Sequence, residues 1–521
     1  MNDMGEATID AILRTHAQRT PDRPAITLDG RTLTYGELDR RTDRLAHSLA
    51  DLGVKPGDRV AFLGRNQIEH FEIVFAMARL GGITVGMNWR LSASELATQF
   101  DDCSPVIVFA SLEAMTTARA ARDLAQTGPR LIAFDSEADG YEALIGQAPH
   151  HPRDPASGSE DICMICYTSG TTGHAKGVAF THASLHAVLA PAGEAWRFDG
   201  DSVSLVCMPT FHTAGLCWGL LALFHGGRDV VVSEFDAGNI VDLMRAKGVT
   251  NAVLAPIMLE QVIDELERRA VALPDLRAVV YGAAPITEPV LRRAVSHLDA
   301  ELIQGYGLTE VNGTISILTG PDHVLEGPSR HRLKSAGQAV AWGAIRVVNP
   351  ETGEDLSPGE VGEVWGKSPG LMTGYWQRPK ETAETITPDG WLRTGDAGYL
   401  DADGYLFLTD RIKDMIVSGG ENVYPIEIEH VLAAHPAVDA VAVIGVPDSR
   451  WGEAVKAVVV VRAGHQVPAD DLIAWARARL ATYKCPKSVD FVDAMPRNAA
   501  GKILKRTLRE AYWAGHDRRI G

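Results

Sequence analysis

The sequence contains few cysteines and no apolar run long enough to cross a membrane. Its 6 cysteines are scattered over 521 residues, far below the density of a disulfide-stapled scaffold, which predicts a reduced, cytoplasmic setting. The longest uncharged apolar run, residues 213–224, is well short of the ~20 residues that a transmembrane helix needs. The first residues lack a basic region followed by an apolar stretch, so we expect no signal peptide.

Basic residues are also in the minority. The chain has 50 Lys and Arg against 67 Asp and Glu, a net charge of −17, which disfavours binding to nucleic acid or to an anionic membrane surface. An anionic substrate would therefore need basic groups gathered at its own site. Apolar residues make up 45% of the chain, and 521 residues exceed the usual length of one domain, so we expect more than one domain with large buried cores.

Short β-branched runs alternate with longer amphipathic ones over the first half of the chain. Thr34 and Glu37 form a capping box at the start of an expected helix, and Ser92 and Glu95 repeat this pattern. The expected helices include 35–52, 67–80 and one that begins at Ser92. The expected strands are 25–28, 59–63, 83–87, 106–109, 203–207, 229–232, 252–254 and 278–281. Strands and helices in alternation predict mostly parallel sheets covered by helices, an α/β fold.

After about residue 391 the pattern changes to close turns and short strands. The remaining segments predict a compact α+β unit with helices at 425–434 and 469–480 and strands at 438–446, at 455–461 and near Val489. We therefore expect a large N-terminal domain over 1–411 and a small C-terminal domain over 412–521.

The strongest local signal is the segment Tyr-Thr-Ser-Gly-Thr-Thr-Gly-His-Ala-Lys-Gly at 167–177, which follows an apolar strand. Its glycines allow backbone amides to converge on an anion, its hydroxyls offer further donors and Lys176 supplies positive charge. The segment is no Walker A loop, because Lys176 lies between Ala175 and Gly177. It predicts a loop that binds phosphate.

This loop resembles the signature loop of the AMP-forming adenylating enzymes, which include acyl- and aryl-CoA synthetases, peptide-synthetase adenylation domains and beetle luciferases. Further segments resemble that family in the same order along the chain. They are LTYGEL at 33–38, GDRVA at 57–61, MPTFH at 208–212, YGAAP at 281–285, QGYGLTE at 304–310, WLRTGD at 391–396, DRIKDMI at 410–416, SGGEN at 418–422 and PRNAAGKILK at 496–505. The resemblance thus spans nearly the whole chain.

The resemblance implies that the chain binds ATP and Mg²⁺. Lys176 and its loop would hold the β- and γ-phosphates, and Thr309 would contact the α-phosphate. Glu310, a hard oxygen ligand, would bind the magnesium ion together with Thr168. Tyr306 would stack on adenine, and Asp396, supported by Arg411, would bind the ribose hydroxyls. The remaining expected nucleotide contacts are Thr168, Ser169, Gly170, Thr171, Thr172, Gly173, Gly282, Ala283, Ala284, Gln304, Gly305 and Gly307.

The resemblance also implies a mobile small domain. Lys502 would bridge the acyl carboxylate and the α-phosphate during adenylation, and rotation about Lys413 would then withdraw it. The hairpin that carries Gly419, Gly420 and Glu421 would replace it, opening a path for coenzyme A.

Four more residues resemble contacts to the other substrates. Trp451 resembles a pantetheine contact. Arg90 and Lys484 resemble contacts to the CoA phosphates, although both also fit a solvated surface. His212 resembles the histidine that lines the acyl pocket, or it is a hydrogen-bonded core histidine. Two departures from the family pattern, Ala175 before the loop lysine and an alanine at 500, remove no charge that the chemistry needs.

We therefore expect an AMP-forming acyl-CoA synthetase that activates a small-molecule carboxylic acid with ATP and transfers the acyl group to CoA. The acid-pocket candidates are His212, Leu216, Met258, Tyr281, Val311, Asn312 and Gly313. They mix small and apolar groups and do not choose between an alkyl chain and a ring. We expect a medium- or long-chain fatty acid, with a cinnamate- or benzoate-type acid as the alternative. A non-catalytic nucleotide-binding protein of the same fold is a second alternative. We expect no nucleic-acid partner; the oligomeric state, for which a homodimer is one candidate, stays open.

Overall fold

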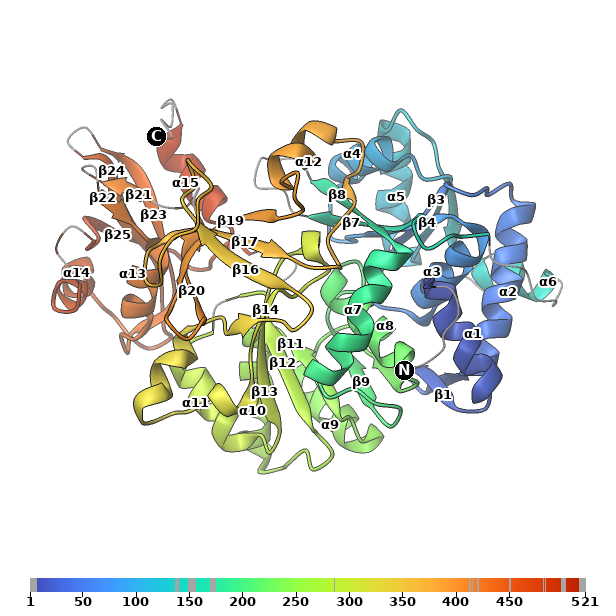
Figure 1. Ribbon diagram of the computed structural model, residues 1–521, viewed down its shortest axis with the longest axis horizontal. Helices are drawn as coiled ribbons and strands as arrows, with labels where there is room; N and C mark the ends of the chain where they lie inside the picture. The colour runs from blue at the N-terminus through green and yellow to red at the C-terminus, as the bar shows by residue number, and fades with distance from the viewer. Residues whose placement is uncertain are drawn as a thin grey trace.

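The computed structural model describes residues 7–135, 140–148, 156–168, 175–284, 286–411, 414, 416–418, 421–448, 451–480, 482, 484–497 and 503–514. Figure 1 shows two large sheets with their helices, a third, smaller sheet, and a smaller unit formed by the C-terminal part of the chain. The helices of the larger part are α1 (Ile9–Arg19), α2 (Tyr35–Asp51), α3 (Ile68–Leu80), α4 (Ala93–Cys103), α5 (Leu112–Leu124), α6 (Tyr141–Gln147), α7 (His182–Ala195), α8 (Thr213–Phe224), α9 (Ala237–Lys247), α10 (Pro256–Arg269), α11 (Glu288–His297) and α12 (Pro379–Thr385).

The first sheet has nine strands and is parallel in its centre. In spatial order they are β15 (Gln338–Ala339), β14 (Ser316–Leu318), β13 (Glu301–Tyr306), β12 (Ala278–Gly282), β11 (Asn251–Leu254), β9 (Val203–Val206), β10 (Arg228–Val231), β1 (Pro24–Leu28) and β2 (Arg31–Thr34). The strands from β13 to β1 pair in parallel, and antiparallel pairs close both edges.

The second sheet has seven strands, again parallel in its centre. Their order is β18 (Gly374–Tyr375), β8 (Lys176–Thr181), β7 (Ile162–Thr168), β4 (Ile83–Met87), β3 (Arg59–Leu63), β5 (Ile107–Ala110) and β6 (Arg130–Ala133). β8 is antiparallel to both of its neighbours. Helix α8 packs in one buried core cluster with residues of both large sheets, so this uncharged and mostly apolar helix joins them. The carboxyl ends of the parallel strands are where open α/β sheets bind ligands.

The third sheet is antiparallel and lies between the large sheets and the C-terminal unit (Figure 1). Its strands are β16 (Ala344–Val348), β17 (Gly362–Lys367), β19 (Leu392–Leu400) and β20 (Leu406–Arg411). The sequence pattern indicated short strands only from about residue 391 on, so β16 and β17 were not predicted, and neither was a separate sheet.

The C-terminal unit is the expected α+β fold. Its elements are β21 (Ile416–Ser418), β22 (Glu421–Val423), α13 (Pro425–Ala433), β23 (Val438–Asp448), β24 (Gly452–Val461), α14 (Ala469–Arg477), β25 (Ser488–Phe491) and α15 (Lys505–Trp513). β23 and β24 form a long antiparallel pair, and β25 adds to β24 in parallel. The fold class predicted from the sequence is confirmed.

Several local predictions agree with the structure residue by residue. β3 and β4 have the predicted bounds, and both capping boxes form, at the start of α2 and of α4. The helix expected over 67–80 begins one residue later, because Gln67 has extended backbone and caps it. The apolar run at 213–224 is the buried helix α8, and no helix in the described part of the chain is long and apolar enough to span a membrane.

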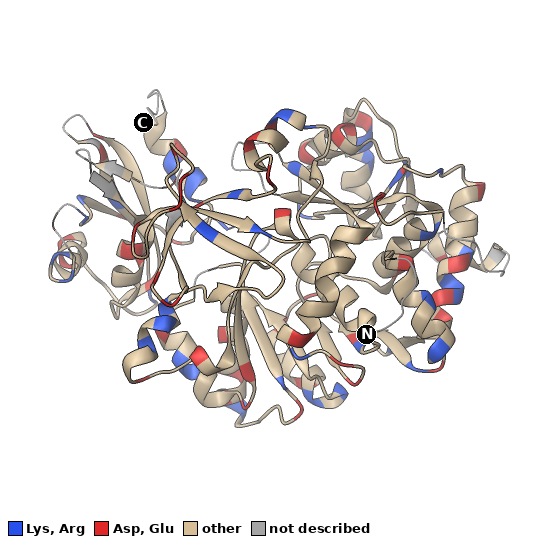
Figure 2. Cartoon of the chain, viewed as in Figure 1, with Lys and Arg blue, Asp and Glu red and all other residues tan. Residues whose placement is uncertain are grey.

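A buried ion cluster fixes the first three helices together. The Arg79 side chain of α3 is 0% exposed and makes ion pairs with Asp10 of α1 (2.6 Å) and with Asp43 (2.6 Å) and Asp39 of α2. Each nitrogen of the guanidinium thus meets a carboxylate, which is how a charge survives burial. On the outer helices, by contrast, acidic and basic side chains are interspersed (Figure 2).

Candidate active site

The predicted phosphate loop joins β7 to β8. Its residues 169–174, which include Ser169, Gly170, Thr171, Thr172 and Gly173, lie outside the described residues. The two ends are described: Thr168 closes β7 and pairs in register with Lys176, which opens β8. The Thr168 hydroxyl donates to the Lys176 carbonyl (3.4 Å). Thr168, the expected metal contact, and Lys176, an expected phosphate contact, therefore lie side by side at the ends of two neighbouring strands of the second sheet.

A tyrosine lies between Lys176 and Glu310. The Nζ atom of Lys176 lies 4.6 Å from the centre of the Tyr375 ring, and the Tyr375 hydroxyl donates to Glu310 Oε1 (2.8 Å). Burial and the nearby Glu310 charge raise the pKa of Tyr375, so its hydroxyl stays protonated and can donate. Thr309 and Glu310 form a short 3₁₀ turn directly after β13. The structure thus brings together the predicted phosphate lysine and the predicted metal ligand.

Glu310 suits a magnesium ion that a nucleotide brings with it. It is a half-buried carboxylate, one of whose oxygens accepts the Tyr375 hydrogen bond. Among the described residues, no group of three or more His, Cys, Asp or Glu side chains could form a complete protein metal site. Magnesium in phosphate-transfer sites usually takes one or two carboxylates and completes its shell with substrate phosphates and water, so the residues present fit this ion.

The predicted ribose and adenine contacts lie on neighbouring strands. The Tyr306 hydroxyl donates to Asp396 Oδ2 (2.7 Å), which joins the end of β13 to β19 of the third sheet. Asp396 pairs in register with Arg411, the last residue of β20. This carboxylate could still accept hydrogen bonds from a vicinal diol, since a carboxylate has about four acceptor positions.

The expected adenine wall is built from closely spaced backbone. Gly282 pairs with Gly305 across β12 and β13, and a side chain at Gly282 would lie 2.4 Å from the Gly305 carbonyl oxygen. The following Ala283 is exposed with φ 65°, and Ala284 is half-buried. A side chain at Gly307 would lie 1.7 Å from the carbonyl oxygen of Gly313. Because these glycines lack side chains, the backbone segments at the ends of β12 and β13 can approach each other closely. The half-buried Gln304 lies next to them in β13.

His212 caps the start of α8, and its environment keeps the ring uncharged. Burial lowers the pKa of His212 to about 4, and the positive charge of Arg90 acts in the same direction. The ring packs against Phe211, with centroids 4.5 Å apart. His212 is therefore neutral at pH 7 and lies within electrostatic reach of Arg90.

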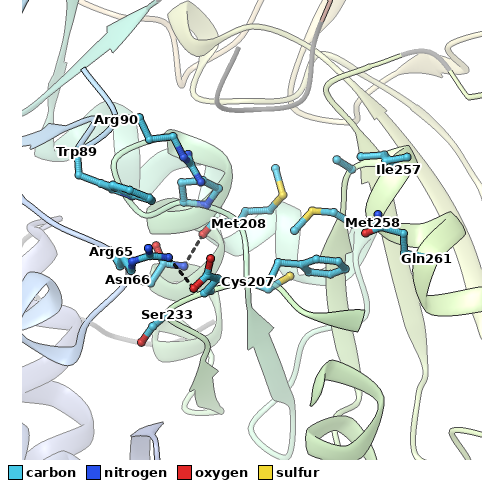
Figure 3. A pocket seen from close by; sticks show the side chains of 14 residues that line it. Arg65, Asn66, Trp89, Arg90, Cys207, Met208, Ser233, Ile257, Met258 and Gln261 are labelled. Atoms are coloured by element: carbon cyan, nitrogen blue, oxygen red, sulfur yellow. Dashed lines mark hydrogen bonds and ion pairs between the residues drawn. The ribbon is translucent and has the colours of Figure 1, made fainter. Parts of the chain in front are cut away.

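A cavity of about 270 Å³ opens near the ends of strands from both large sheets. Its lining residues are Arg65, Asn66, Trp89, Arg90, Cys207, Met208, Pro209, Ser233, Glu234, Phe235, Ala255, Ile257, Met258 and Gln261. In Figure 3 the side chains of Met208 and Met258 point into it. Of the predicted acid-pocket residues, Met258 alone lines this cavity, whereas Leu216, Tyr281 and Val311 are buried in the core. Asn312 is also buried, and Gly313 is half-buried beside it.

Arginine charges at this cavity differ in how far they are neutralised. Arg65 stacks on Trp89 (4.4 Å) and pairs with Glu113 (3.1 Å) and Glu234 (2.8 Å). Arg90 stacks on Trp89 (4.5 Å) and is exposed. It makes no ion pair with any described residue, so its charge is available to an anion. Asn66 donates to the Met208 carbonyl (2.9 Å), as the dashed line in Figure 3 marks.

The small domain leaves much of its expected chemistry outside the described residues. Lys413, Gly419, Gly420 and Lys502 are not described, nor are the side chains of Arg411 and Glu421. Trp451 is exposed at the start of β24. The Nζ atom of Lys484 lies 2.7 and 2.9 Å from the two oxygens of Glu427, and its contact with a CoA phosphate stays a prediction.

Comparison with known proteins defines the class. The family model of the AMP-binding enzyme matches residues 13–376, and the model of the AMP-binding enzyme C-terminal domain matches residues 427–502. The chain belongs to the AMP-binding enzyme family. The predicted resemblance is therefore confirmed, as is the predicted class of ATP-dependent, AMP-forming acid–thiol ligases with Mg²⁺ and CoA.

The relatives cover nearly the whole chain. A fatty acid–[acyl-carrier-protein] ligase, ScoC, from Streptomyces coeruleorubidus is 39% identical over 97% of this chain and 96% of its own. A feruloyl-CoA synthase from Amycolatopsis sp. is 39% identical over 95% of this chain and 97% of its own. Among solved structures, ATP-bound MatB from Rhodopseudomonas palustris matches with a TM-score of 0.89 at 30% identity, covering 98% of this chain and 100% of that one.

Sequence reasoning missed four residues of this site: Tyr375, Arg65, Asn66 and Trp89. Each acts through a contact with a segment distant in the chain or through stacking, which leaves no local pattern. The pair Trp89-Arg90 beside a strand end was the one available signal, and it indicated Arg90 only.

Proposed function

We propose that this ligase activates a medium- or long-chain fatty acid as acyl-AMP, with release of pyrophosphate, and then transfers the acyl group to the thiol of CoA. The observation that carries the adenylation half is the convergence of Lys176, Tyr375 and Glu310 at one sheet edge. A cation for phosphate oxygens and a carboxylate for Mg²⁺ are what this step needs, because positioning and charge stabilisation do most of its catalysis.

In this proposal the nucleotide lies across the ends of both large sheets. Lys176 and its loop hold the β- and γ-phosphates, Thr309 contacts the α-phosphate, and Glu310 with Thr168 binds Mg²⁺. Tyr306 packs on adenine and Asp396 accepts from the ribose hydroxyls. The Tyr306–Asp396 hydrogen bond supports these two roles, since it fixes both side chains next to each other. Lys502 supplies the charge that bridges the carboxylate and the α-phosphate.

For the second half-reaction we propose that CoA enters at the cavity beside Trp89. Its lining of thioether and aliphatic side chains suits the slender pantetheine arm, and Arg90 at its edge suits a phosphate. Arg90 lies close enough to His212 for its charge to lower the pKa of that ring. In this proposal the neutral His212 ring faces the acyl carbonyl. The contact of Lys484, which pairs with Glu427, with a CoA phosphate stays a prediction.

The acid is the finer part of the proposal. A fatty acid is supported by the name of the ScoC relative, a fatty acid–[acyl-carrier-protein] ligase. An aryl acid is the second candidate, because a feruloyl-CoA synthase is equally similar, at 39% identity.

Pyrophosphate release on adding ATP, Mg²⁺ and an acid tests the proposal. The panel spans short, medium and long fatty acids, cinnamates and benzoates, and thioester formation is then followed with CoA. Preference for C8 or longer chains is the expected result. If only cinnamates support pyrophosphate release, the substrate is an aryl acid and not a fatty acid. If none of the acids in the panel supports release, the proposed function is contradicted.

Lys502→Ala tests the adenylation half. Removing one group that stabilises transition-state charge typically lowers the rate by about 100- to 1000-fold, so acid-dependent pyrophosphate release is expected to fall by that factor. Thioester formation from supplied acyl-AMP and CoA is expected to continue, because the lysine is then withdrawn. Lys487→Ala, which removes an exposed lysine of the same domain, is the control. Equal rates for both variants would contradict the role.

We propose that residues 412–521 rotate about Lys413 between the two half-reactions, and that the enzyme is a homodimer. Light scattering decides the second: a mass equal to one chain would contradict it.

A further inference from the structure

The segment 372–378, here called the strap, crosses from the third sheet to the candidate phosphate site. Its backbone pairs with β8, Gly374 with Ala179 and Tyr375 with Val178. The strap also reaches the other half of the site, because the Met372 amide donates to the Glu310 carbonyl (2.8 Å). One short segment is therefore bonded both to the strand that begins with Lys176 and to the turn that carries Glu310.

The far end of the strap is anchored as well. Arg378 forms an ion pair with Asp102 (2.9 Å), and Asp102 also accepts from the Tyr167 hydroxyl (2.8 Å). Tyr167 is the residue before Thr168, at the base of the predicted phosphate loop. The strap is thus fixed to both strands that flank the loop, so the position of Tyr375 is set by backbone pairing and by an ion pair whose arginine is partly exposed.

Tyr375 contacts the two groups that the proposed chemistry needs, one with each part of its side chain. Its ring faces the Lys176 ammonium at 4.6 Å, a distance at which a cation is attracted to an aromatic face. Its hydroxyl donates to Glu310 (2.8 Å). The residue is 9% exposed, which strengthens both contacts by excluding water.

We propose that Tyr375 is a positioning residue that orients the Glu310 carboxylate for Mg²⁺ through its hydroxyl and orients Lys176 for the phosphates through its ring. The inference rests on the proposed roles of Lys176 and Glu310. Groups that hydrogen-bond a metal ligand fix its orientation, and their loss typically weakens metal binding about 10- to 100-fold. The ring orients the lysine and leaves its positive charge free, whereas a second carboxylate would neutralise that charge.

The two parts of the side chain can be removed separately. Tyr375→Phe keeps the ring beside Lys176 and removes only the hydrogen bond to Glu310. It is expected to raise the Mg²⁺ concentration for half-maximal pyrophosphate release by roughly 10-fold or more. Binding of ATP without a metal is expected to stay unchanged in this variant. Tyr375→Leu removes the ring too and is expected to weaken metal-free ATP binding by about 2- to 5-fold.

Tyr405→Phe is the matched control. Its hydroxyl also donates to a carboxylate at 2.8 Å, that of Asp322, which has no proposed role in the site. If the loss of any tyrosine–carboxylate hydrogen bond changed the Mg²⁺ dependence, both variants would show the change. The proposed role predicts it in Tyr375→Phe only. Melting temperatures of both variants report how far each fold is disturbed.

Binding of Mn²⁺ in the presence of a non-hydrolysable ATP analogue, followed by electron paramagnetic resonance, provides a readout independent of turnover. Weaker Mn²⁺ binding in Tyr375→Phe is expected, with no further loss when Tyr375→Phe is added to Glu310→Gln, because one acts through the other. Wild-type Mn²⁺ affinity in Tyr375→Phe, or fully additive losses, would overturn the inference. If the wild type shows no acid-dependent pyrophosphate release, the proposed function fails, but the Mn²⁺ measurement still decides the role of Tyr375.

Discussion

Asp229 provides a stability prediction that depends on one buried group. The residue lies in β10, is 0% exposed and pairs in register with Ser204 of β9. Helix α8 packs closely over it: a side chain at Gly219 would lie 3.1 Å from Asp229 Oδ2. Burial raises the pKa of Asp229 well above its ordinary value, and the Ser204 hydroxyl opposes this shift only in part. The carboxyl is therefore protonated in the folded protein where it is ionised in the unfolded chain.

The sign of the pH effect follows from this difference. Below an unfolded-state pKa of about 3.9 both states hold the proton, and the contribution of the group to stability is fully present. As the pH rises toward the raised pKa of the folded state, only the unfolded chain loses the proton, so stability falls by about 1.4 kcal/mol per pH unit. Asp229→Asn removes the titration and with it the slope.

The assay is thermal unfolding of wild type and Asp229→Asn at pH 5, 6, 7 and 8, at one scan rate. The difference between the two melting temperatures is expected to shift in favour of the variant as the pH rises, by roughly 1 °C per pH unit until the pH reaches the folded-state pKa. Any fixed cost of the buried amide is the same at each pH and does not affect this shift. Asp201→Asn is the control, since the Asp201 side chain is 84% exposed and pairs with Arg23 at the surface. Parallel melting curves for wild type and Asp229→Asn would refute the assignment of a buried, protonated carboxyl.

Two further predictions concern arginines in opposite settings. Arg90→Gln is expected to raise the KM for CoA about 5-fold, as fits an exposed charge worth about 1 kcal/mol, and to leave adenylation unchanged. An unchanged KM for CoA in steady-state kinetics would show that CoA does not use Arg90. Arg79→Met leaves Asp43 buried without its cation and Asp10 with Arg14 alone, and it is expected to cost about 3–5 kcal/mol, seen as a fall in melting temperature. Arg122→Met, at a partly exposed pair with Asp123, is its control, and an equally small fall for both would contradict the account of the buried cluster.

Short-range patterns account for what could be predicted from the sequence. The capping box of Thr34 and Glu37 and the strands β3 and β4 depend on neighbouring residues, and they form as predicted. The contact between Tyr375 and Glu310 joins residues 65 positions apart, and it depends on the pairing of a two-residue strand with β8. No periodicity marks such a strand. The third sheet was missed for the same reason. Turns separate its antiparallel strands, and in the sequence these turns look the same as ordinary loops.

The acidic balance of the chain and its anionic substrates are reconciled by how individual cations are held. Arg79 and Arg65 are surrounded by carboxylates, and their charges serve the fold. Lys176 and Arg90 are held instead over the rings of Tyr375 and Trp89, with no ion pair to any residue that the structure describes. An aromatic face orients a cation at a cost of about 1 kcal/mol or less when it is released, whereas a carboxylate would compete with the incoming phosphate for the same charge. A net charge of −17 is therefore compatible with binding ATP and CoA, provided that the cations at the site are oriented by rings and left unneutralised.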